Sequence, residues 1–182
     1  MDGTGESRWD ERSGGAGAGF DAFVRDSSRG LLRVGWLLTG DWATAEDLVQ
    51  TALITTWRKW RMIQRTDRPE VYVHRVMMTT YLGWRRRRWT GEVPSADVPD
   101  RTAGPDDFGR FDLQSLRSAM HRLPPKQRAT ITLRYFLDLN ERATADALGC
   151  SLGTVKSNAA RAIATLRTDP NLAALLDEGV IR

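Results

Sequence analysis

The sequence predicts an all-α protein made of two small helical domains joined by a flexible linker. Apolar residues recur at three- and four-residue spacing from Phe20 to about Trp89 and again from Leu113 onward, as on the buried face of a helix. The 90–112 stretch between these segments is acidic, rich in Pro and Gly and poor in large apolar residues, which is typical of a linker. No segment shows the apolar–polar alternation of a half-buried strand.

The first domain is expected to span residues 20–89 and to contain three helices. The helical pattern breaks at residues 39–41, and Asp41 or Thr44 can cap the helix that follows. A third helix should begin near Pro69, because proline fits the first turn of a helix. Residues 1–19 are rich in Gly and lack apolar periodicity, so we expect them to be disordered.

The second domain, residues 113–168, is expected to contain a helix-turn-helix. Asn140 suits the N-cap of a short helix, Gly149 stands where a helix end needs a left-handed residue, and Ser151 can cap the next helix. Two helices joined by such a tight glycine turn form a helix-turn-helix, whose second helix enters the DNA major groove. Residues 169–182 are expected to form a short tail.

The second of these helices leaves a polar set of side chains facing outward once its apolar residues are buried. This set combines hydrogen-bonding groups for base edges with cations for phosphates. Its members are Thr154, Lys156, Ser157, Asn158 and Arg161. A pair of short capped helices also occurs in ordinary helical proteins. The interpretation as a DNA-binding motif therefore also depends on the net charge of the surrounding segment.

Charge is strongly segregated along the chain. Residues 54–90 carry ten basic and two acidic groups, and residues 114–168 carry nine and three. Residues 91–113, which separate these blocks, carry two basic and six acidic groups. Two basic blocks on either side of an acidic one indicate two polyanion-binding surfaces on a tether. The alternative is that both blocks are the solvated basic faces of an ordinary helical protein.

Four consecutive arginines, residues 85–88, lie between Trp84 and Trp89. Single-stranded nucleic acid is held by this combination, because aromatic rings stack on bases while cations follow the backbone. Arg58, Lys59, Arg61 and Arg65 add charge before Pro69. Cations at the end of a helix also interact favourably with the helix dipole, which is the alternative explanation. Three other tryptophans fall into apolar stripes and are expected in the core: Trp36, Trp57 and Trp60.

A different surface is expected on the helix around residues 47–51, which lies outside the basic blocks. Its candidate contact residues are Asp47, Leu48, Val49 and Gln50. Polar groups beside an apolar one suit a protein partner, although most acidic helix faces are merely solvated.

Several classes of function are disfavoured by composition. His74 and His121 are far apart with no metal-ligand spacing, and no phosphate-binding glycine loop is present, so we expect no enzyme, no metal and no cofactor. The single cysteine, Cys150, excludes an internal disulfide and is more typical of a small buried hydrophobe than of a redox sensor. No run is long and apolar enough for a bilayer, and no export signal is visible, so a cytoplasmic protein without membrane contact is expected.

Three motifs, in the order in which they occur, resemble those of the extracytoplasmic-function sigma factors of the sigma-70 superfamily, and in particular a SigE-like subgroup. Residues 45–52 (AEDLVQTA) resemble the region 2 helix that grips the clamp helices of RNA polymerase. Residues 71–76 (VYVHRV), continuing to residues 84–88, resemble the part of region 2 that melts and reads the −10 element. Residues 123–128 (LPPKQR) and 148–157 (LGCSLGTVKS) are similar to region 4, which reads the −35 element.

The resemblance implies a sigma factor that binds core RNA polymerase and promoter DNA. Asp47, Leu48, Val49 and Gln50 would contact polymerase, and the polar set of the helix-turn-helix would read the −35 element. The residues implied for the −10 element are Arg61, Arg65, Tyr72, Arg75, Thr79, Trp84, Arg85, Arg86, Arg87 and Arg88. Members of this family are often held by an anti-sigma factor, which is a further expected partner.

Three positions depart from the pattern of the family. Thr79 stands where Asn is usual, at the pocket for a flipped −10 base. Ala143 replaces a common acidic residue, and Asn158 stands where Arg is common. The alternative function is a free-standing helix-turn-helix regulator that binds duplex DNA without polymerase. The second domain alone would suffice for it, but it leaves residues 47–52 and the linker unexplained.

Overall fold

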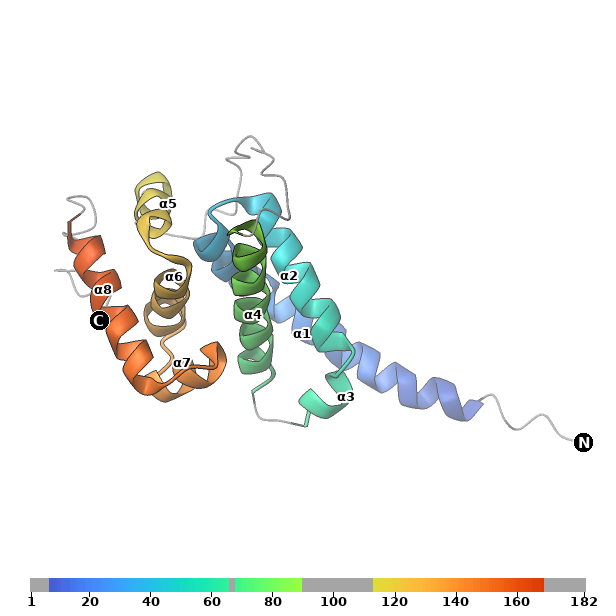
Figure 1. Ribbon diagram of the computed structural model, residues 1–182. Coiled ribbons are helices and arrows are strands. Elements are labelled where there is room, and N and C mark those ends of the chain that lie inside the picture. Colours follow the sequence, from blue (N-terminus) through green and yellow to red (C-terminus); the bar gives the residue numbers. More distant parts are fainter. Residues whose placement is uncertain (1–6, 66–67, 90–112, 169–182) are drawn as a thin grey trace, which may run out of the picture.

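The computed structural model describes residues 7–65, 68–89 and 113–168, and every regular element within these ranges is a helix (Figure 1). The all-α prediction is therefore confirmed. Residues 90–112 and 169–182, the predicted linker and tail, lie outside the described residues.

The N-terminal module consists of α1 (Ser7–Thr39), α2 (Trp42–Trp57), α3 (Trp60–Ile63) and α4 (Pro69–Trp89). The corner between α1 and α2 is formed by Gly40, whose φ of +72° is accessible to glycine at little cost. Asp41 then caps α2: its Oδ2 accepts the backbone N–H of Thr44 at 2.7 Å and the Thr44 hydroxyl at 2.6 Å. The predicted break at residues 39–41, the predicted helix cap at Asp41 and the predicted helix start at Pro69 are all present.

The first helix begins much earlier than expected. Residues 7–19 were predicted to be disordered, but they are helical, and residues 1–6 lie outside the described residues. The helix is anchored at Phe20, whose ring lies 5.0 Å from that of Trp57 and 5.1 Å from that of Trp60. Extending a helix that is already nucleated adds one hydrogen bond for each residue fixed, which favours continuation of α1 beyond this anchor.

The C-terminal module consists of α5 (Leu113–Arg122), α6 (Pro125–Ile131), a π-helical turn η1 (Thr132–Phe136), α7 (Glu141–Leu148) and α8 (Leu152–Arg167). The π-turn was not predicted. It is closed by the backbone N–H of Leu137, which donates to the Thr132 carbonyl at 3.1 Å, five residues earlier.

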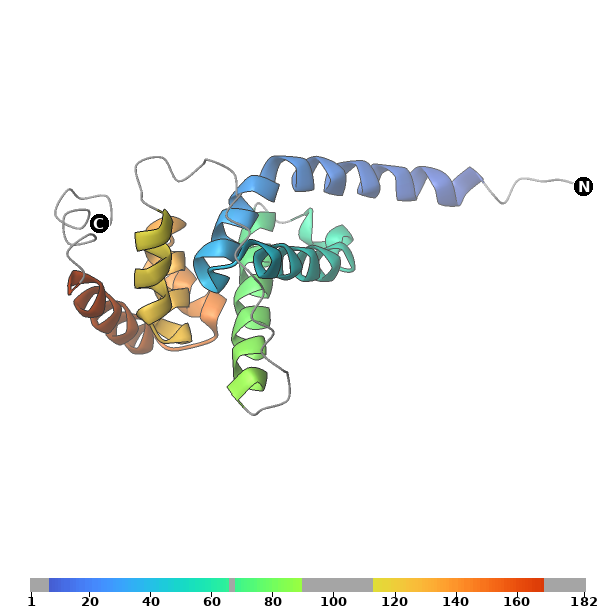
Figure 2. The same cartoon turned by 90° about the horizontal axis from the view of Figure 1, so that it is seen from above.

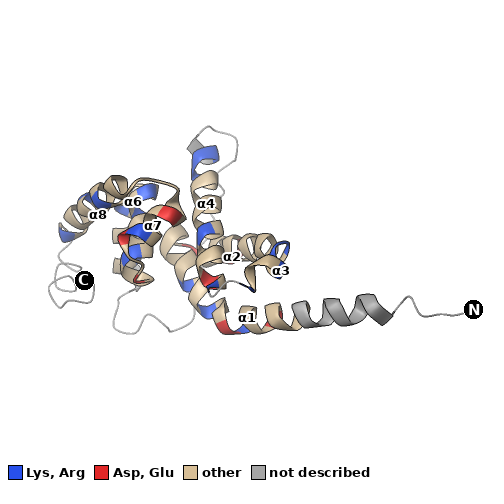
Figure 3. Cartoon of the chain, turned by 90° about the horizontal axis from the view of Figure 1, so that it is seen from below, with Lys and Arg blue, Asp and Glu red and all other residues tan. Residues whose placement is uncertain are grey.

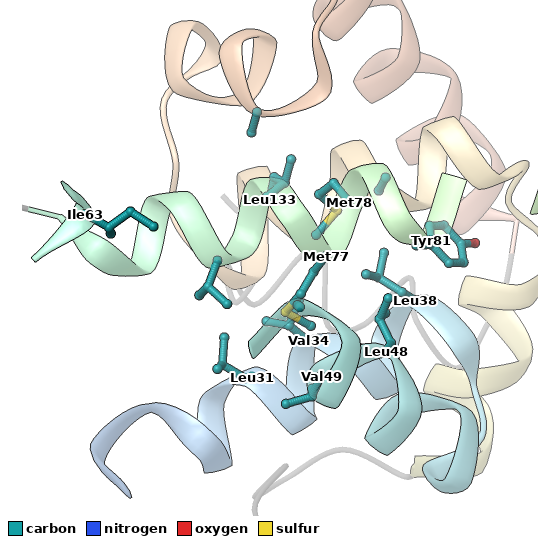
Figure 4. Packing of buried hydrophobic residues seen from close by; sticks show 14 of the residues in the cluster. Leu31, Val34, Leu38, Leu48, Val49, Ile63, Met77, Met78, Tyr81 and Leu133 are labelled. Atoms are coloured by element: carbon teal, nitrogen blue, oxygen red, sulfur yellow. The ribbon is translucent and has the colours of Figure 1, made fainter. Parts of the chain in front are cut away.

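The two modules pack against each other. The charge pattern of the sequence had instead suggested two separate polyanion-binding surfaces joined by a flexible linker. Helices α6 and α7 and the η1 turn lie against α1 and α4 (Figures 1 and 2). Ala129, Leu133 and Ala147 of the C-terminal module belong to the same buried cluster as Met77 and Met78 of α4 (Figure 4). The apolar surface of each module is therefore completed by the other.

A second buried cluster also includes residues of both modules. Trp36 and Trp42, whose rings stack at 5.6 Å across the α1–α2 corner, share it with Leu116, Met120 and Leu123. Because neither cluster belongs to one module alone, opening the contact between the modules would expose apolar surface on both sides.

One charged side chain lies at the centre of this arrangement. Arg128 of α6 is only 2% exposed, and its guanidinium donates to four backbone carbonyls. Nε donates to Met120 at 2.8 Å, and Nη2 donates to His121 at 3.1 Å and Leu123 at 3.2 Å. Nη1 donates to the carbonyl of Leu38, near the end of α1, at 2.7 Å.

The acceptors of Arg128 are carbonyls at or just after helix C-terminal ends, where the last carbonyls lack the usual intrahelical partner and carry partial negative charge; that of Met120 also accepts the backbone N–H of Leu123 at 3.1 Å. One cation thus satisfies the ends of both α5 and α1. A buried cation is tolerated when its hydrogen-bonding groups are satisfied in this way.

Replacing this side chain should destabilise the protein strongly. Arg128→Ala removes the side-chain donor from four carbonyls, of which only that of Met120 keeps a second donor, the backbone N–H of Leu123, so we expect the free energy of unfolding to fall by about 3 kcal/mol or more. Chemical denaturation followed by circular dichroism measures the change. Lys126→Ala, which removes an exposed cation from the same helix, should change the free energy by only about 0.5 kcal/mol. Equal effects of the two substitutions would contradict the central role of Arg128.

Candidate nucleic-acid interface

The helix-turn-helix of α7 and α8 is built by three local devices. Asn140 caps α7 by accepting the backbone N–H of Ala143 at 2.8 Å. Gly149 ends α7 with φ +62° and ψ +41°, the left-handed conformation. Ser151 then caps α8 by accepting the N–H of Thr154 at 3.2 Å. These three expectations from the sequence are confirmed.

The α8 helix has one buried and one exposed face. Val155, Ala162 and Leu166 are buried. Four of the predicted DNA-contacting residues share the opposite face, at positions i, i+3, i+4 and i+7: Thr154, Ser157, Asn158 and Arg161. Asn158 is half-buried and the other three are exposed. A continuous row of hydrogen-bonding groups with one cation is thus available for a DNA groove.

Lys156 lies outside this row. Its Nζ is 3.6 Å from Oε2 of Glu141 on α7, an exposed ion pair that joins the two helices of the motif. The structure therefore brings together four of the five residues predicted for the −35 element and places Lys156 to one side. An exposed pair of this kind contributes little to stability, about 0–1 kcal/mol, so it does not prevent Lys156 from turning to a phosphate.

The α4 helix presents a second polar face. Tyr72, Arg75, Thr79 and Arg86 follow one another at i, i+3, i+7 and i+14 and so lie on one side of the helix. Arg75, Thr79 and Arg86 are exposed, and Tyr72 is half-buried. The opposite side is buried and includes Val73, Met77 and Tyr81.

The Thr79 hydroxyl is engaged by its own helix. It donates to the carbonyls of Val76 at 2.9 Å and Arg75 at 3.1 Å. Its outward groups are therefore a methyl group and the acceptor lone pairs of the oxygen. A base recognised at this position would have to donate a hydrogen bond or make an apolar contact.

The C-terminal end of α4 projects away from the other helices and is densely basic (Figures 2 and 3). Arg85, Arg86 and Arg87 are exposed there, whereas the side chain of Arg88 lies outside the described residues. Trp84 is half-buried and packs against the core, so it is only partly available for stacking on a base. Arg61 of α3 and Arg65, which follows this helix, are exposed, and α3 lies near the N-terminal end of α4 (Figure 1).

The α2 helix carries the candidate surface for a protein partner. Asp47 and Gln50 are exposed, but Leu48 and Val49 are buried at 0% and 5% exposure. Leu48 and Val49 were predicted to contact the partner; the structure instead places them in the core beneath the surface. Their burial follows from the helix period, which turns them toward α1 and α4.

Two apolar residues extend the exposed α2 face and were missed. Ile54 is 56% exposed and Trp57 is 47% exposed, at positions i+7 and i+10 from Asp47. Trp57 was expected in the core, and that expectation is wrong: only part of its ring is covered, by Phe20. Their exposure could have been predicted from the sequence, because both residues share the helical phase of Asp47 and Gln50. Trp36 and Trp60 are buried as predicted.

The surroundings shift the pKa of several titratable groups, the two histidines and the cysteine among them. Burial lowers the pKa of His74 to about 4, against a smaller opposing effect of Glu70. His121 is partly exposed, and desolvation of its ring, together with the neighbouring Arg128, lowers its pKa to about 4. Burial raises the pKa of the half-buried Cys150 thiol, which opposes formation of the thiolate that a redox sensor needs.

Within the described ranges, no three His, Cys, Asp or Glu side chains gather where they could hold a metal ion. None of the helices in that part of the chain combines the length and the apolar character required to span a bilayer.

Comparison with known proteins matches both modules to one family. Residues 23–90 match the model of Sigma-70 region 2, and residues 113–166 match that of Sigma-70, region 4. The chain is 39% identical to the RNA polymerase sigma-E factor of Streptomyces antibioticus over 150 residues, which cover 82% of this chain and 83% of that protein. It is 29% identical to the ECF RNA polymerase sigma factor SigL of Mycobacterium tuberculosis over 165 residues, covering 86% and 93% of the two chains.

A solved structure shares the fold. The sigma factor RpoE of Bartonella quintana, crystallised in complex with the anti-sigma factor NepR, aligns with a TM-score of 0.68 at 24% identity and covers 82% of this chain and 94% of that one. Two modules that match regions 2 and 4 define the class, a sigma factor of the sigma-70 type. The chain belongs to the extracytoplasmic-function branch of that family and is SigE-like.

The shifted histidines predict that the fold weakens in mild acid. Both pKa values lie below the ordinary value of 6.5, so the folded chain binds fewer protons than the unfolded chain between about pH 6.5 and pH 4. The contribution of the two histidines to the free energy of unfolding is complete above about pH 6.5 and is lost as the pH falls toward 4. Thermal unfolding at about pH 7 and about pH 5 should show a lower midpoint in acid.

The control is the double variant His74→Gln, His121→Gln, which should depend less on pH over this interval. If its midpoint fell as steeply as that of the unmodified chain, the acid sensitivity would have to come from other groups.

Proposed function

We propose that this chain binds core RNA polymerase through α2, reads the −10 element with α4 and the −35 element with α8, and carries out no chemistry itself. The observation that supports this best is the presence of two separate polar helix faces, one on each module, in a chain whose modules match sigma regions 2 and 4. A regulator that used only its helix-turn-helix would not need the face on α4.

The α8 face suits duplex DNA. Thr154, Ser157 and Asn158 offer hydrogen bonds to base edges, and Arg161 offers a bidentate donor for guanine or a charge for a phosphate. The caps at Ser151 and Gly149 fix the helix relative to α7, so the four side chains are presented on a rigid support.

The α4 face suits a melted strand. Tyr72 provides an aromatic surface for a base, and Arg75 and Arg86 provide cations for the backbone on the same side of the helix. Capture of an unstacked base offsets an unstacking cost of about a few kcal/mol, which is how such a surface can promote melting.

The α2 face suits polymerase. Asp47 and Gln50 supply polar contacts, and Ile54 and Trp57 supply an exposed apolar area beside them. Buried aromatic residues with a polar rim are typical of the energetically important part of a protein interface. Because a structural relative was crystallised with an anti-sigma factor, we also propose that a protein of that class controls this chain.

The function is tested by run-off transcription with core RNA polymerase and a promoter template. We expect transcripts only when this chain is added. Asp47→Ala combined with Gln50→Ala should reduce both capture of core polymerase and transcript yield, because these exposed groups contact polymerase and support no core packing.

Asp146→Ala on α7 is the matched control, since it also removes an exposed carboxylate, and it should leave capture unchanged. Site-specific duplex binding by the chain alone, with no capture of polymerase, would instead establish the free-standing regulator.

The α8 assignment makes a separate prediction. Arg161→Ala should weaken binding to templates that carry the cognate −35 element by about 1–3 kcal/mol and relax the preference for its sequence. Competition between cognate and scrambled −35 templates in the polymerase complex measures the preference. Arg142→Ala, which removes an exposed cation from α7, should leave that preference intact. Unchanged preference in Arg161→Ala would refute the proposed recognition face.

A further inference from the structure

The four residues of the exposed row on α8 differ in how much of their hydrogen-bonding capacity is left for DNA. The hydroxyl of Ser157 donates to the Thr154 carbonyl at 3.1 Å. The hydroxyl of Thr154 lies 2.9 Å from that of Ser151, so these two groups share a hydrogen bond. Because a hydroxyl has one hydrogen to donate, the Ser157 hydroxyl keeps only acceptor lone pairs toward a base. Both hydroxyls of the row are therefore already engaged by the first turns of their own helix.

The other two members of the row, Asn158 and Arg161, keep all their side-chain hydrogen-bonding groups. Among the residues that the structure describes, none forms a hydrogen bond or an ion pair with either side chain. The Asn158 amide offers an acceptor oxygen beside an NH₂ donor, and the Arg161 guanidinium offers a planar fork of N–H donors. Both groups can form two hydrogen bonds with one partner, which a single hydroxyl does poorly. Discrimination between bases is therefore concentrated in these two residues.

The fold itself gives no reason for an asparagine at position 158. Asparagine inside a helix is less favourable than alanine by about 0.5 kcal/mol, and the next two residues of α8 are alanines. Asn158 caps neither end of the helix, since Ser151 and Thr168 occupy the cap positions. It is half-buried, so its side chain has less freedom to lose on binding than a fully exposed one. Residues that break a local rule without a structural return are expected at functional sites.

The spacing of Asn158 and Arg161 suits two neighbouring base pairs. Three residues along a helix correspond to a rise of about 4.5 Å, and the two positions lie on the same side of α8. Successive base pairs of duplex DNA are about 3.4 Å apart. In the major groove an asparagine amide matches N6 and N7 of adenine, and a guanidinium matches O6 and N7 of guanine.

We propose that Asn158 and Arg161 set the base preference of α8, with Asn158 reading an adenine and Arg161 reading a guanine of the neighbouring base pair. Thr154 and Ser157 support binding without choosing the base, because a hydroxyl pairs with any of them. This inference rests on the proposed function only for the placement of α8 in a groove of duplex DNA. The division of labour within the row follows from the hydrogen bonds of α8 itself.

The test selects bound templates from a pool of duplexes randomised over the −35 element, using the full chain with core RNA polymerase. We expect one adenine and one guanine at neighbouring base pairs, each preferred over the other bases by about 5- to 150-fold. Asn158→Ala should abolish the preference for adenine and leave that for guanine. Arg161→Ala should do the reverse. Sequencing of the bound fraction gives the preference at every base pair in one measurement.

Three further variants separate base reading from a general loss of affinity. Asn158→Arg should change the preference at the same base pair from adenine to guanine, because the new donors match guanine. Asn158→Gln keeps the amide and should still prefer adenine. Ala160→Arg is the matched control: it adds the same cation to an exposed position of α8 outside the row and should leave the adenine preference intact. Circular dichroism establishes that each variant keeps its helices.

An adenine preference that survives Asn158→Ala in a folded chain would overturn the assignment, as would the absence of any selected adenine. Loss of the preference at one base pair, with a switch to guanine in Asn158→Arg, supports it. The same selection run with the chain alone separates this inference from the proposed function. If run-off transcription fails but the chain alone selects the adenine and guanine, the base assignment stands and the proposed function is at fault. If transcription succeeds without that selection, the assignment is wrong and the function stands.

Discussion

The arrangement of the whole chain depends on the burial of one guanidinium among backbone carbonyls. Arg128 has no carboxylate among its hydrogen-bond partners; it is held by the C-terminal ends of α5 and α1. This places the corner of the C-terminal module against the end of the first helix, and the two apolar clusters close around that contact.

Each helix with a proposed binding surface has one buried side and one exposed side. On α2, α4 and α8 the side turned to the core is apolar, and the exposed side carries the groups assigned to a partner, which on α2 include the apolar Ile54 and Trp57. The packing that fixes a helix therefore also fixes which side chains it presents. For this reason Leu48 and Val49 belong to the support of the α2 surface, although their neighbours Asp47 and Gln50 belong to the surface itself.

The features that could be predicted from the sequence are those determined by residues close to one another in the chain. Asp41, Asn140, Gly149 and Ser151 act through neighbours within a few residues, and each is found in its expected role. The burial of Arg128 could not be predicted, because it depends on a segment distant in sequence: Leu38 lies 90 residues from Arg128. The exposure of Trp57, in contrast, was predictable from the helical phase that it shares with Asp47 and Gln50. The ion pair of Lys156 could not be predicted for the same reason as the burial of Arg128, since its partner Glu141 belongs to the other helix of the motif.

A contact built from carbonyl acceptors differs from a buried ion pair in the way it can break. Separating a buried ion pair leaves an unpaired charge in an apolar site, which strongly disfavours separation. Here the charge stays with its own module, where three acceptors remain, and the group released is a neutral carbonyl near the end of a helix. The remaining resistance to opening comes from the apolar residues of the shared clusters, Leu133 and Met78 among them.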